Sequence, residues 1–211
     1  MNIGIIGSGH LGFSMGNIWT EKGHQVCFSY SRSPTTLAAT VAASGLNASL
    51  CTPIQAAQFA NVVLLAVHWP QVSQIVADIR PYMSGKTLLT CVMPWRADYS
   101  GLLFGTDTSA AEEIARLVPE ANLVEAFPLL ADGLQLPTPQ SPTDPATIFY
   151  CGDDADAKDD VAGLLEDLGL QPADVGDLTS ARLLEPVMAL FRKLAIGQGE
   201  GADIVLKLTR R

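Results

Sequence analysis

Three glycines near the start of the chain have the spacing of a phosphate-binding turn. The apolar run Met1 to Ile6 leads directly into Gly7-Ser8-Gly9-His10-Leu11-Gly12. Glycines at this spacing allow a tight turn, a close approach of the backbone to a pyrophosphate, and close packing of the helix that follows. Residues 13–22 contain no proline, so strand, loop and helix come in the required order. The motif therefore predicts a dinucleotide-binding site.

The residues after the second expected strand indicate which dinucleotide is bound. A site for NAD normally carries Asp or Glu about 20 residues beyond the glycine turn, to hold the ribose 2′-hydroxyl. This chain has Arg32 there, between Ser31 and Ser33, and no acidic residue between Lys22 and Ala77. A guanidinium and two hydroxyls suit a 2′-phosphate, so the sequence predicts NADP(H). A solvated surface arginine is the alternative, but it would not explain the missing carboxylate.

Three further segments follow expected strands and should line the same crevice. They are Ala66-Val67-His68-Trp69, Cys91-Val92-Met93-Pro94-Trp95 and Phe127-Pro128-Leu129. All three are largely apolar, which suits a flat conjugated ring beside a nicotinamide better than a small polar hydroxy acid. His68 is the candidate catalytic residue, either for proton transfer or for contact alone, since a catalytic histidine needs an orienting partner.

No other catalytic or metal-binding constellation emerges. Residues 152–160 carry five aspartates, but a calcium loop starting at Asp154 would need glycine and glutamate where Asp159 and Leu165 stand. Acids gathered at a helix N-terminus are the simpler interpretation. We therefore expect no metal site. Hydride transfer between bound molecules requires few catalytic side chains, because the protein mainly aligns the reacting atoms.

Apolar runs rich in branched residues recur along the chain and predict strands buried in a parallel sheet. These strands are expected at residues 25–29, 62–67, 87–93 and 123–127, apolar on both faces. Helices are expected at 34–44, 53–59, 70–80 and 109–117, several with proline in the first turn. The alternation predicts an α/β fold with a doubly wound, mostly parallel sheet and a ligand crevice at the carboxyl ends of its strands.

Composition changes after this pattern and suggests how the chain is divided. Residues 1–131 form the expected NADP-binding domain, and residues 132–146, with four prolines, form an irregular connection. Residues 147–211 are expected to extend the same sheet, with a strand at 147–151, a helix at 154–168, a short strand at 171–175 and a long helix from 178. A large separate substrate domain does not fit in 211 residues.

Charge and cysteine content limit the partners. The net charge of −9 argues against nucleic acid and against anionic membranes, which both need a basic face. No apolar run of 18 residues offers a membrane span. The four cysteines are widely spaced, without a CxxC pair, and are interpreted as small apolar residues of a cytoplasmic protein in a reducing compartment.

The helix expected from residue 178 is more apolar than one buried stripe requires. This surface is either a homodimer interface or the side of a helix buried within one subunit. The apolar residues are Leu183, Leu184, Val187, Met188, Leu190, Phe191 and Leu194.

Motifs along nearly the whole chain resemble those of the NADPH-dependent coenzyme F420 reductases, also called F420-dependent NADP oxidoreductases. The wider group includes the NADPH-binding domains of membrane ferric reductases. The motifs are the glycine turn, Ser31-Arg32-Ser33, Val67-His68-Trp69, Val92-Met93-Pro94, Ser109-Ala110-Ala111-Glu112, Cys151-Gly152-Asp153-Asp154 and Ala181-Arg182-Leu183-Leu184-Glu185-Pro186.

The resemblance implies a role for each part of the site. The pyrophosphate would be held by Gly7, Ser8, Gly9, His10, Leu11 and Gly12, and the 2′-phosphate by Ser31, Arg32 and Ser33. The nicotinamide half would lie near Ala66, Val67, His68, Met93 and Pro94, and the acceptor ring across Phe127, Pro128 and Leu129. Members of the family carry a polar residue where this chain has Pro128, so the acceptor pocket lacks one hydrogen-bonding group.

The expected function is hydride transfer between NADPH and a small-molecule redox acceptor, either a flavin or the deazaflavin F420. One alternative is an NADPH-dependent reductase of a small carbonyl or imine compound. Another is a non-catalytic NADP(H)-binding module that reports redox state to a partner protein.

Overall fold

A computed structural model describes residues 1–30, 35, 37–38, 41, 47–126, 145–198 and 207–209. Eight strands form one sheet in the order β3-β2-β1-β4-β5-β6-β7-β8. Their bounds are β1 Asn2–Ile6, β2 Gln25–Ser29, β3 Ala48–Leu50, β4 Val62–Leu65, β5 Thr87–Thr90, β6 Asn122–Ala126, β7 Thr147–Gly152 and β8 Gln171–Asp174.

The first six strands of the chain are mutually parallel, and β7 turns antiparallel to β6 before β8 pairs parallel to β7. This confirms the predicted α/β fold with a mostly parallel sheet. The strands after residue 147 continue the same sheet, whereas the domain boundaries at 131 and 146 stay a prediction, because residues 127–144 lie outside the described part of the chain.

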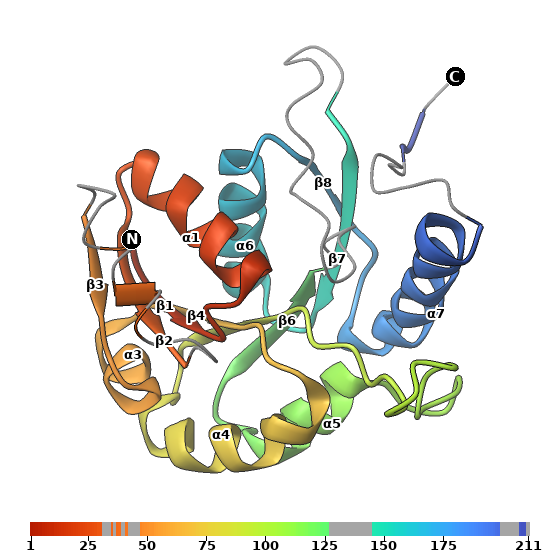
Figure 1. Cartoon of the computed structure of the whole chain (residues 1–211), viewed down its shortest axis with the longest axis horizontal. Coiled ribbons are helices and arrows are strands. Elements are labelled where there is room, and N and C mark those ends of the chain that lie inside the picture. The colour runs from red at the N-terminus through yellow and green to blue at the C-terminus, as the bar shows by residue number, and fades with distance from the viewer. Residues whose placement is uncertain are drawn as a thin grey trace.

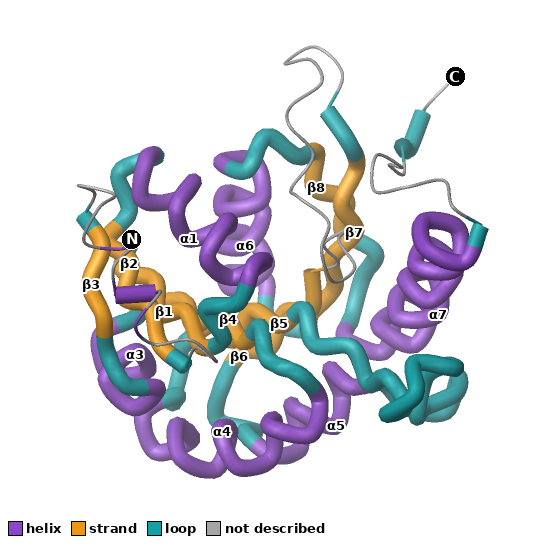
Figure 2. The backbone as a smooth tube through the Cα atoms, viewed as in Figure 1, coloured by secondary structure: helices purple, strands orange, loops and turns teal. Residues whose placement is uncertain are grey.

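Helices cover both faces of the sheet (Figure 1). On one face lie α1 and α6, and on the other lie α3, α4 and α5, with α7 beside β7 (Figures 1 and 2). The bounds are α1 His10–Glu21, α3 Pro53–Phe59, α4 Val72–Ile79, α5 Ala110–Leu117, α6 Ala155–Asp167 and α7 Ala181–Arg192. Of the helix predicted at 34–44, the described residues Thr35, Leu37, Ala38 and Val41 are helical.

Local signals explain where several helices begin. Thr52 and Gln55 form a capping box around Pro53, with Gln55 N–H donating to Thr52 Oγ1 at 3.2 Å and Thr52 N–H donating to Gln55 Oε1 at 2.9 Å. Ser109 caps α5 and Asp154 caps α6 through the same kind of bond. The cap at Asp154 confirms that its acidic cluster marks a helix N-terminus.

Side chains alternate between two apolar clusters, one on each face of the sheet. Ile3, Ile5 and Trp19 belong to the cluster under α1 and α6, and Trp19 Nε1 donates a hydrogen bond to the carbonyl oxygen of Leu164 at 2.8 Å. The cluster on the other face includes Leu184, Met188 and Phe191 of α7. On the outer side of α7, Leu183 and Leu190 are 68% and 54% exposed, and the homodimer stays a prediction.

Three sequence expectations need correction. Strand β3 was not expected, because it is a three-residue edge strand with exposed residues rather than an apolar run. Glu125 lies buried in β6, so that strand is not apolar on both faces. Cys27 and Cys51 are joined in a disulfide, since the pairing of β2 with β3 brings them together, so the cysteines are not all free thiols.

Within the residues that the structure describes, no helix combines the length and the apolar composition needed to cross a membrane.

Candidate functional site

The last residues of three neighbouring strands lie in one row at the carboxyl edge of the sheet. Ile6 of β1 pairs with Leu65 of β4, which pairs with Thr90 of β5. The segments that follow these strands contain the glycine turn, Ala66 to His68, and Met93 with Pro94. Parallel pairing therefore brings three of the predicted site segments to one edge, where α/β sheets bind ligands.

The glycine turn lies against the end of β4. Gly7 has a φ of +107°, and a Cβ there would come within 2.2 Å of the carbonyl oxygen of Ala66. A Cβ on Gly12 would come within 2.2 Å of the carbonyl oxygen of Gly7. Both positions therefore require glycine for the fold itself, because α1 begins directly over the turn.

Gly9 has a different environment. It is the N-cap of α1 and is exposed, and a Cβ built on it meets no atom within 4 Å. It offers no side-chain cap, and the first turn of α1 contains no acidic residue. The N-terminal N–H groups of α1 therefore face open space that a phosphate could fill, so this turn fits the pyrophosphate of a dinucleotide.

The other residues of the turn contribute in different ways. The hydroxyl of Ser8 is buried and donates to the carbonyl oxygen of Ser29 at 2.8 Å, which ties the turn to β2. Leu11 packs against the apolar cluster under α1, whereas His10 is exposed at the first residue of the helix. A bound phosphate would thus meet backbone N–H groups and the His10 side chain.

Residues 66–68 leave β4 with partly buried side chains. The carbonyl oxygen of His68 accepts a hydrogen bond from Gln71 N–H at 3.0 Å, at the start of a short 3₁₀ turn, Trp69–Gln71. Among the described residues, none is hydrogen-bonded to the His68 imidazole. No residue in the described part of the chain therefore orients His68 for proton transfer, and such hydrogen bonds often form only when substrate is bound.

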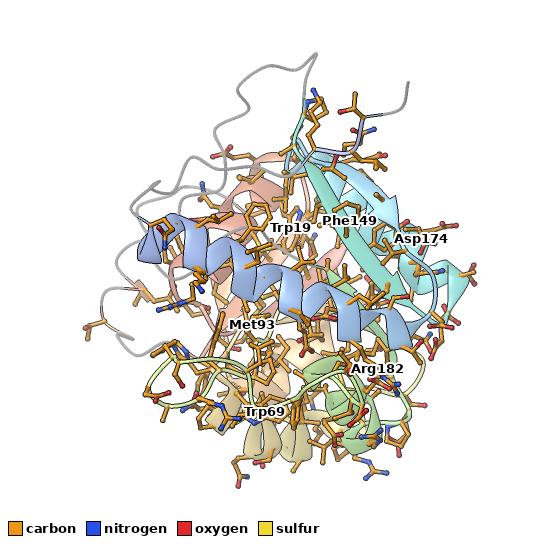
Figure 3. The ribbon with its side chains drawn as sticks, turned by 90° about the vertical axis from the view of Figure 1, so that its right-hand side faces the viewer. Trp19, Trp69, Met93, Phe149, Asp174 and Arg182 are labelled. Atoms are coloured by element: carbon orange, nitrogen blue, oxygen red, sulfur yellow. A yellow bond between two sulfur atoms is a disulfide. The ribbon has the colours of Figure 1, made fainter. Side chains whose placement is uncertain are left out.

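Met93 and Pro94 lie at the corresponding place after β5. Val67, Trp69, Met93 and Trp95 all pack on the cluster shared with α4 and α7. In Figure 3, the labelled Met93 and Trp69 lie on one side of α7, and Trp19 lies on the other. This corner presents apolar and aromatic surface, as the sequence predicted.

Two of the predicted groups of site residues belong to segments outside the described part of the chain. Ser31, Arg32 and Ser33, expected at the 2′-phosphate, lie outside the described residues, as do Phe127, Pro128 and Leu129, expected at the acceptor. Their neighbours are described: Ser29 and Tyr30 end beside the glycine turn, and Ala126 ends β6 next to β5.

Burial raises the pKa of two ionisable groups near this edge. Burial, the charge of Glu185 and that of Glu112 raise the pKa of Glu125, whose Oε2 has no hydrogen-bond partner among the described residues. Burial and the nearby Glu125 raise the pKa of the Cys91 thiol to about 12. Cys91 therefore stays a thiol at neutral pH and lacks the thiolate that nucleophilic catalysis requires.

Sequence reasoning missed several residues at this edge. Tyr30 has a φ of +53° and a 44% exposed side chain just before the predicted phosphate-binding residues. Arg192, at the end of α7, lies over the rings of Trp95 and Tyr99. No local sequence signal predicts the contact of Arg192 with these two rings, because α7 and the loop that carries the rings lie far apart in the sequence.

Known proteins share both the sequence pattern and the fold. Residues 2–94 match the family model described as "NADP oxidoreductase coenzyme F420-dependent". The F420-dependent NADP reductase of Methanocaldococcus jannaschii is 27% identical over 146 residues, 67% of this chain and 65% of that protein. The metalloreductase STEAP3 of Rattus norvegicus is 27% identical over 188 residues, 88% of this chain and 36% of that protein.

The chain thus spans less than two thirds of the length of either of these relatives. A crystal structure of a protein assigned as an F420-dependent NADP reductase from Arthrobacter sp. FB24 superposes with a TM-score of 0.81 and 23% identity, covering 99% of both chains. At that identity the superposition supports the fold. Over residues 2–94, less than half of its length, the chain is similar to the family of F420-dependent NADP oxidoreductases.

Proposed function

We propose that this chain binds NADP(H) along the carboxyl edge of its sheet and passes a hydride between NADPH and a flat, conjugated acceptor, with the deazaflavin F420 as the first candidate and a flavin as the second. The observation that carries the proposal is the joint placement of the glycine turn and the apolar corners after β4 and β5. The family match supports the same cofactor.

The residues divide the binding of the dinucleotide among them. The backbone of Gly7 to Gly12 and the N–H groups of α1 would hold the pyrophosphate. Arg32, with Ser31 and Ser33, would pair with the 2′-phosphate. Val67, Met93 and Pro94 would enclose the nicotinamide, and NADPH, when bound, supplies the hydride.

Catalysis at such a site rests on alignment and exclusion of water rather than on covalent chemistry. Apolar side chains on the β4 and β5 corners would stack an acceptor ring against the nicotinamide face. Phe127, Pro128 and Leu129 are the proposed far wall of this acceptor pocket. His68 is the candidate proton donor to the reduced acceptor, and contact with the nicotinamide is its other possible role.

A turnover assay with a panel of acceptors tests the proposal. The purified protein is mixed with NADPH and, separately, with F420, FMN, FAD, a simple ketone and a cyclic imine, each against a blank without protein. Loss of nicotinamide absorbance only with F420 or a flavin is the expected result. Turnover only with the ketone or imine would favour the carbonyl or imine reductase, and tight NADPH binding without turnover would favour a non-catalytic module.

A further inference from the structure

The loop of residues 94–108, which joins β5 to α5, begins at the proposed nicotinamide corner. It folds back on itself: Leu103 N–H donates to the carbonyl oxygen of Pro94 at 2.8 Å, and Trp95 pairs with Leu102 in an isolated antiparallel bridge. A movement of this loop would therefore displace Pro94 and the adjacent Met93. The loop lies beside α7 in Figure 2.

Arg192 lies over two neighbouring aromatic rings of this loop, whose centroids are 6.4 Å apart. Its Cζ is 5.3 Å from the ring centroid of Trp95 and 4.9 Å from that of Tyr99. Tyr99 has a φ of +57°, an uncommon conformation for a residue with a bulky side chain. Tyr99 thus combines an uncommon backbone conformation with a ring that lies close to the guanidinium.

The guanidinium is available for these rings because no described carboxylate pairs with it. The five ion pairs among the described residues involve other cations, namely His24, Arg80, Arg116, Lys158 and Arg182. A cation over the face of Trp or Tyr is attracted by the electron density of the ring. Arg192 therefore joins α7 to the loop through its two aromatic contacts.

Both sides of this connection rest on the folded core. Met188 and Phe191 of α7 are buried in the apolar cluster that also contacts Trp95, so the last turn of the helix is fixed when it presents Arg192. On the other side of the corner, the ring of Phe104 packs edge-on against that of Trp69, with centroids 5.3 Å apart. The loop thus contacts two fixed parts of the structure: Trp69, in the segment after β4, and Arg192, at the end of α7.

We propose that Arg192 is a positioning residue for the hydride acceptor. By holding Trp95 and Tyr99, it fixes the 94–108 loop against α7. The fixed loop sets the distance between the β5 corner and the acceptor ring. This inference rests on the proposed function, because the acceptor is taken to bind at that corner.

Three substitutions separate this role from general stability. Arg192→Met keeps the long apolar stem and removes the cation, whereas Arg192→Lys keeps a cation without the planar group that stacks on rings. Lys193→Met is the matched control: it removes the same charge one residue along the chain, from an exposed side chain. Three measurements are made on each variant: amide hydrogen exchange in residues 96–104, kinetics with the acceptor that the wild type reduces, and the dissociation constant for NADPH.

In Arg192→Met we expect faster exchange in the loop and a roughly twofold to tenfold rise in the KM for the acceptor, the range expected for loss of cation–π contacts. The dissociation constant for NADPH should rise less than the KM for the acceptor, because the glycine turn that would hold the pyrophosphate follows β1 and is not part of this loop. Arg192→Lys should recover part of the loss, and Lys193→Met should behave as wild type. The double variant Tyr99→Leu/Arg192→Met should raise the KM for the acceptor by less than the product of the increases in the two single variants, because both substitutions remove the same contact.

Unchanged loop exchange in Arg192→Met would overturn the inference, and so would faster exchange with an unaltered KM for the acceptor. If the wild type reduces no acceptor, the proposed function itself fails and the positioning role fails with it. Hydrogen exchange would still show whether Arg192 holds the loop. The two failures are therefore distinguishable.

Discussion

The carboxyl group of Glu185 on α7 accepts a hydrogen bond from the backbone N–H of Ala110, the first residue of α5, at 2.5 Å. It lies 3.4 Å from the N–H of Ala111 and is only 2% exposed. On the same two helices, Arg182 and Glu112 form a two-bond ion pair with distances of 2.6 and 2.9 Å. An acidic side chain of α7 thus caps the N-terminus of the neighbouring helix α5 in the protein interior.

This buried acid makes stability depend on pH. Burial is the main reason that the pKa of Glu185 rises from 4.5 to about 8, outweighing the hydrogen bonds from Ala110 and Ala111, which lower it. The folded protein therefore keeps a proton that the unfolded chain releases. The resulting stabilisation is complete below pH 4.5 and is lost as the pH rises to about 8.

We expect the free energy of unfolding, measured in urea, to fall between about pH 5 and about pH 8 by an amount on the order of a few kcal/mol. Glu185→Gln keeps an acceptor oxygen but cannot ionise, so its decline should be shallower. Glu120→Gln, which removes an exposed carboxylate paired with Arg80, is the control and should keep the wild-type slope. An identical slope in Glu185→Gln and wild type would disprove the assignment.

Replacing Gly9 separates nucleotide binding from folding. A Cβ at Gly9 has open space, so Gly9→Ala should unfold at the wild-type temperature. The same methyl would occupy the place where a pyrophosphate approaches the backbone, and the dissociation constant for NADPH should rise at least roughly tenfold.

Gly12→Ala, which would bring its Cβ to 2.2 Å from the carbonyl oxygen of Gly7, should instead lower the free energy of unfolding by about 1–3 kcal/mol. Calorimetry and thermal melts of both variants test this, and wild-type affinity in Gly9→Ala would contradict it.

Much of the fold could be predicted because its signals are local. The apolar run of β4 and the capping residues of α3 and α5 lie within a few residues of the elements they define. Strand β3 lacks such a signal, since its stability comes from pairing with β2. The disulfide between Cys27 and Cys51 depends on that same pairing and could not follow from cysteine spacing.

The candidate site also combines features with local sequence signals and features that depend on long-range contacts. The placement of the glycine turn and of the segments after β4 and β5 at one edge of the sheet could be predicted, because the carboxyl ends of neighbouring parallel strands share one edge. The contact of Arg192 with Trp95 could not be predicted, since it depends on how the end of α7 packs against the 94–108 loop. The buried Glu125 and Glu185 also escaped prediction, because acidic residues in a sequence usually indicate solvent-exposed positions.

Reversing the charge at Arg32 tests the choice of dinucleotide. Arg32→Asp should weaken NADPH binding roughly tenfold to a hundredfold, the equivalent of one charge-assisted hydrogen bond of about 1.5–3 kcal/mol. NADH has no 2′-phosphate, so its dissociation constant should change little. Lys22→Asp, at the opposite end of α1, controls for the change in net charge. Dissociation constants for both nucleotides are measured by calorimetry; equal losses would show that Arg32 does not contact the phosphate.

The disulfide predicts a specific count of thiols. Unfolded without reductant, the protein should react with a thiol reagent at two cysteines, Cys91 and Cys151, and after reduction at all four. Because the bond closes a loop between cysteines 24 positions apart, reduction should lower the free energy of unfolding by about 3 kcal/mol. Cys51→Ser should abolish this effect of reductant, whereas Cys91→Ser should retain it. Four reactive thiols in the untreated protein would mean that Cys27 and Cys51 are neighbours without being bonded.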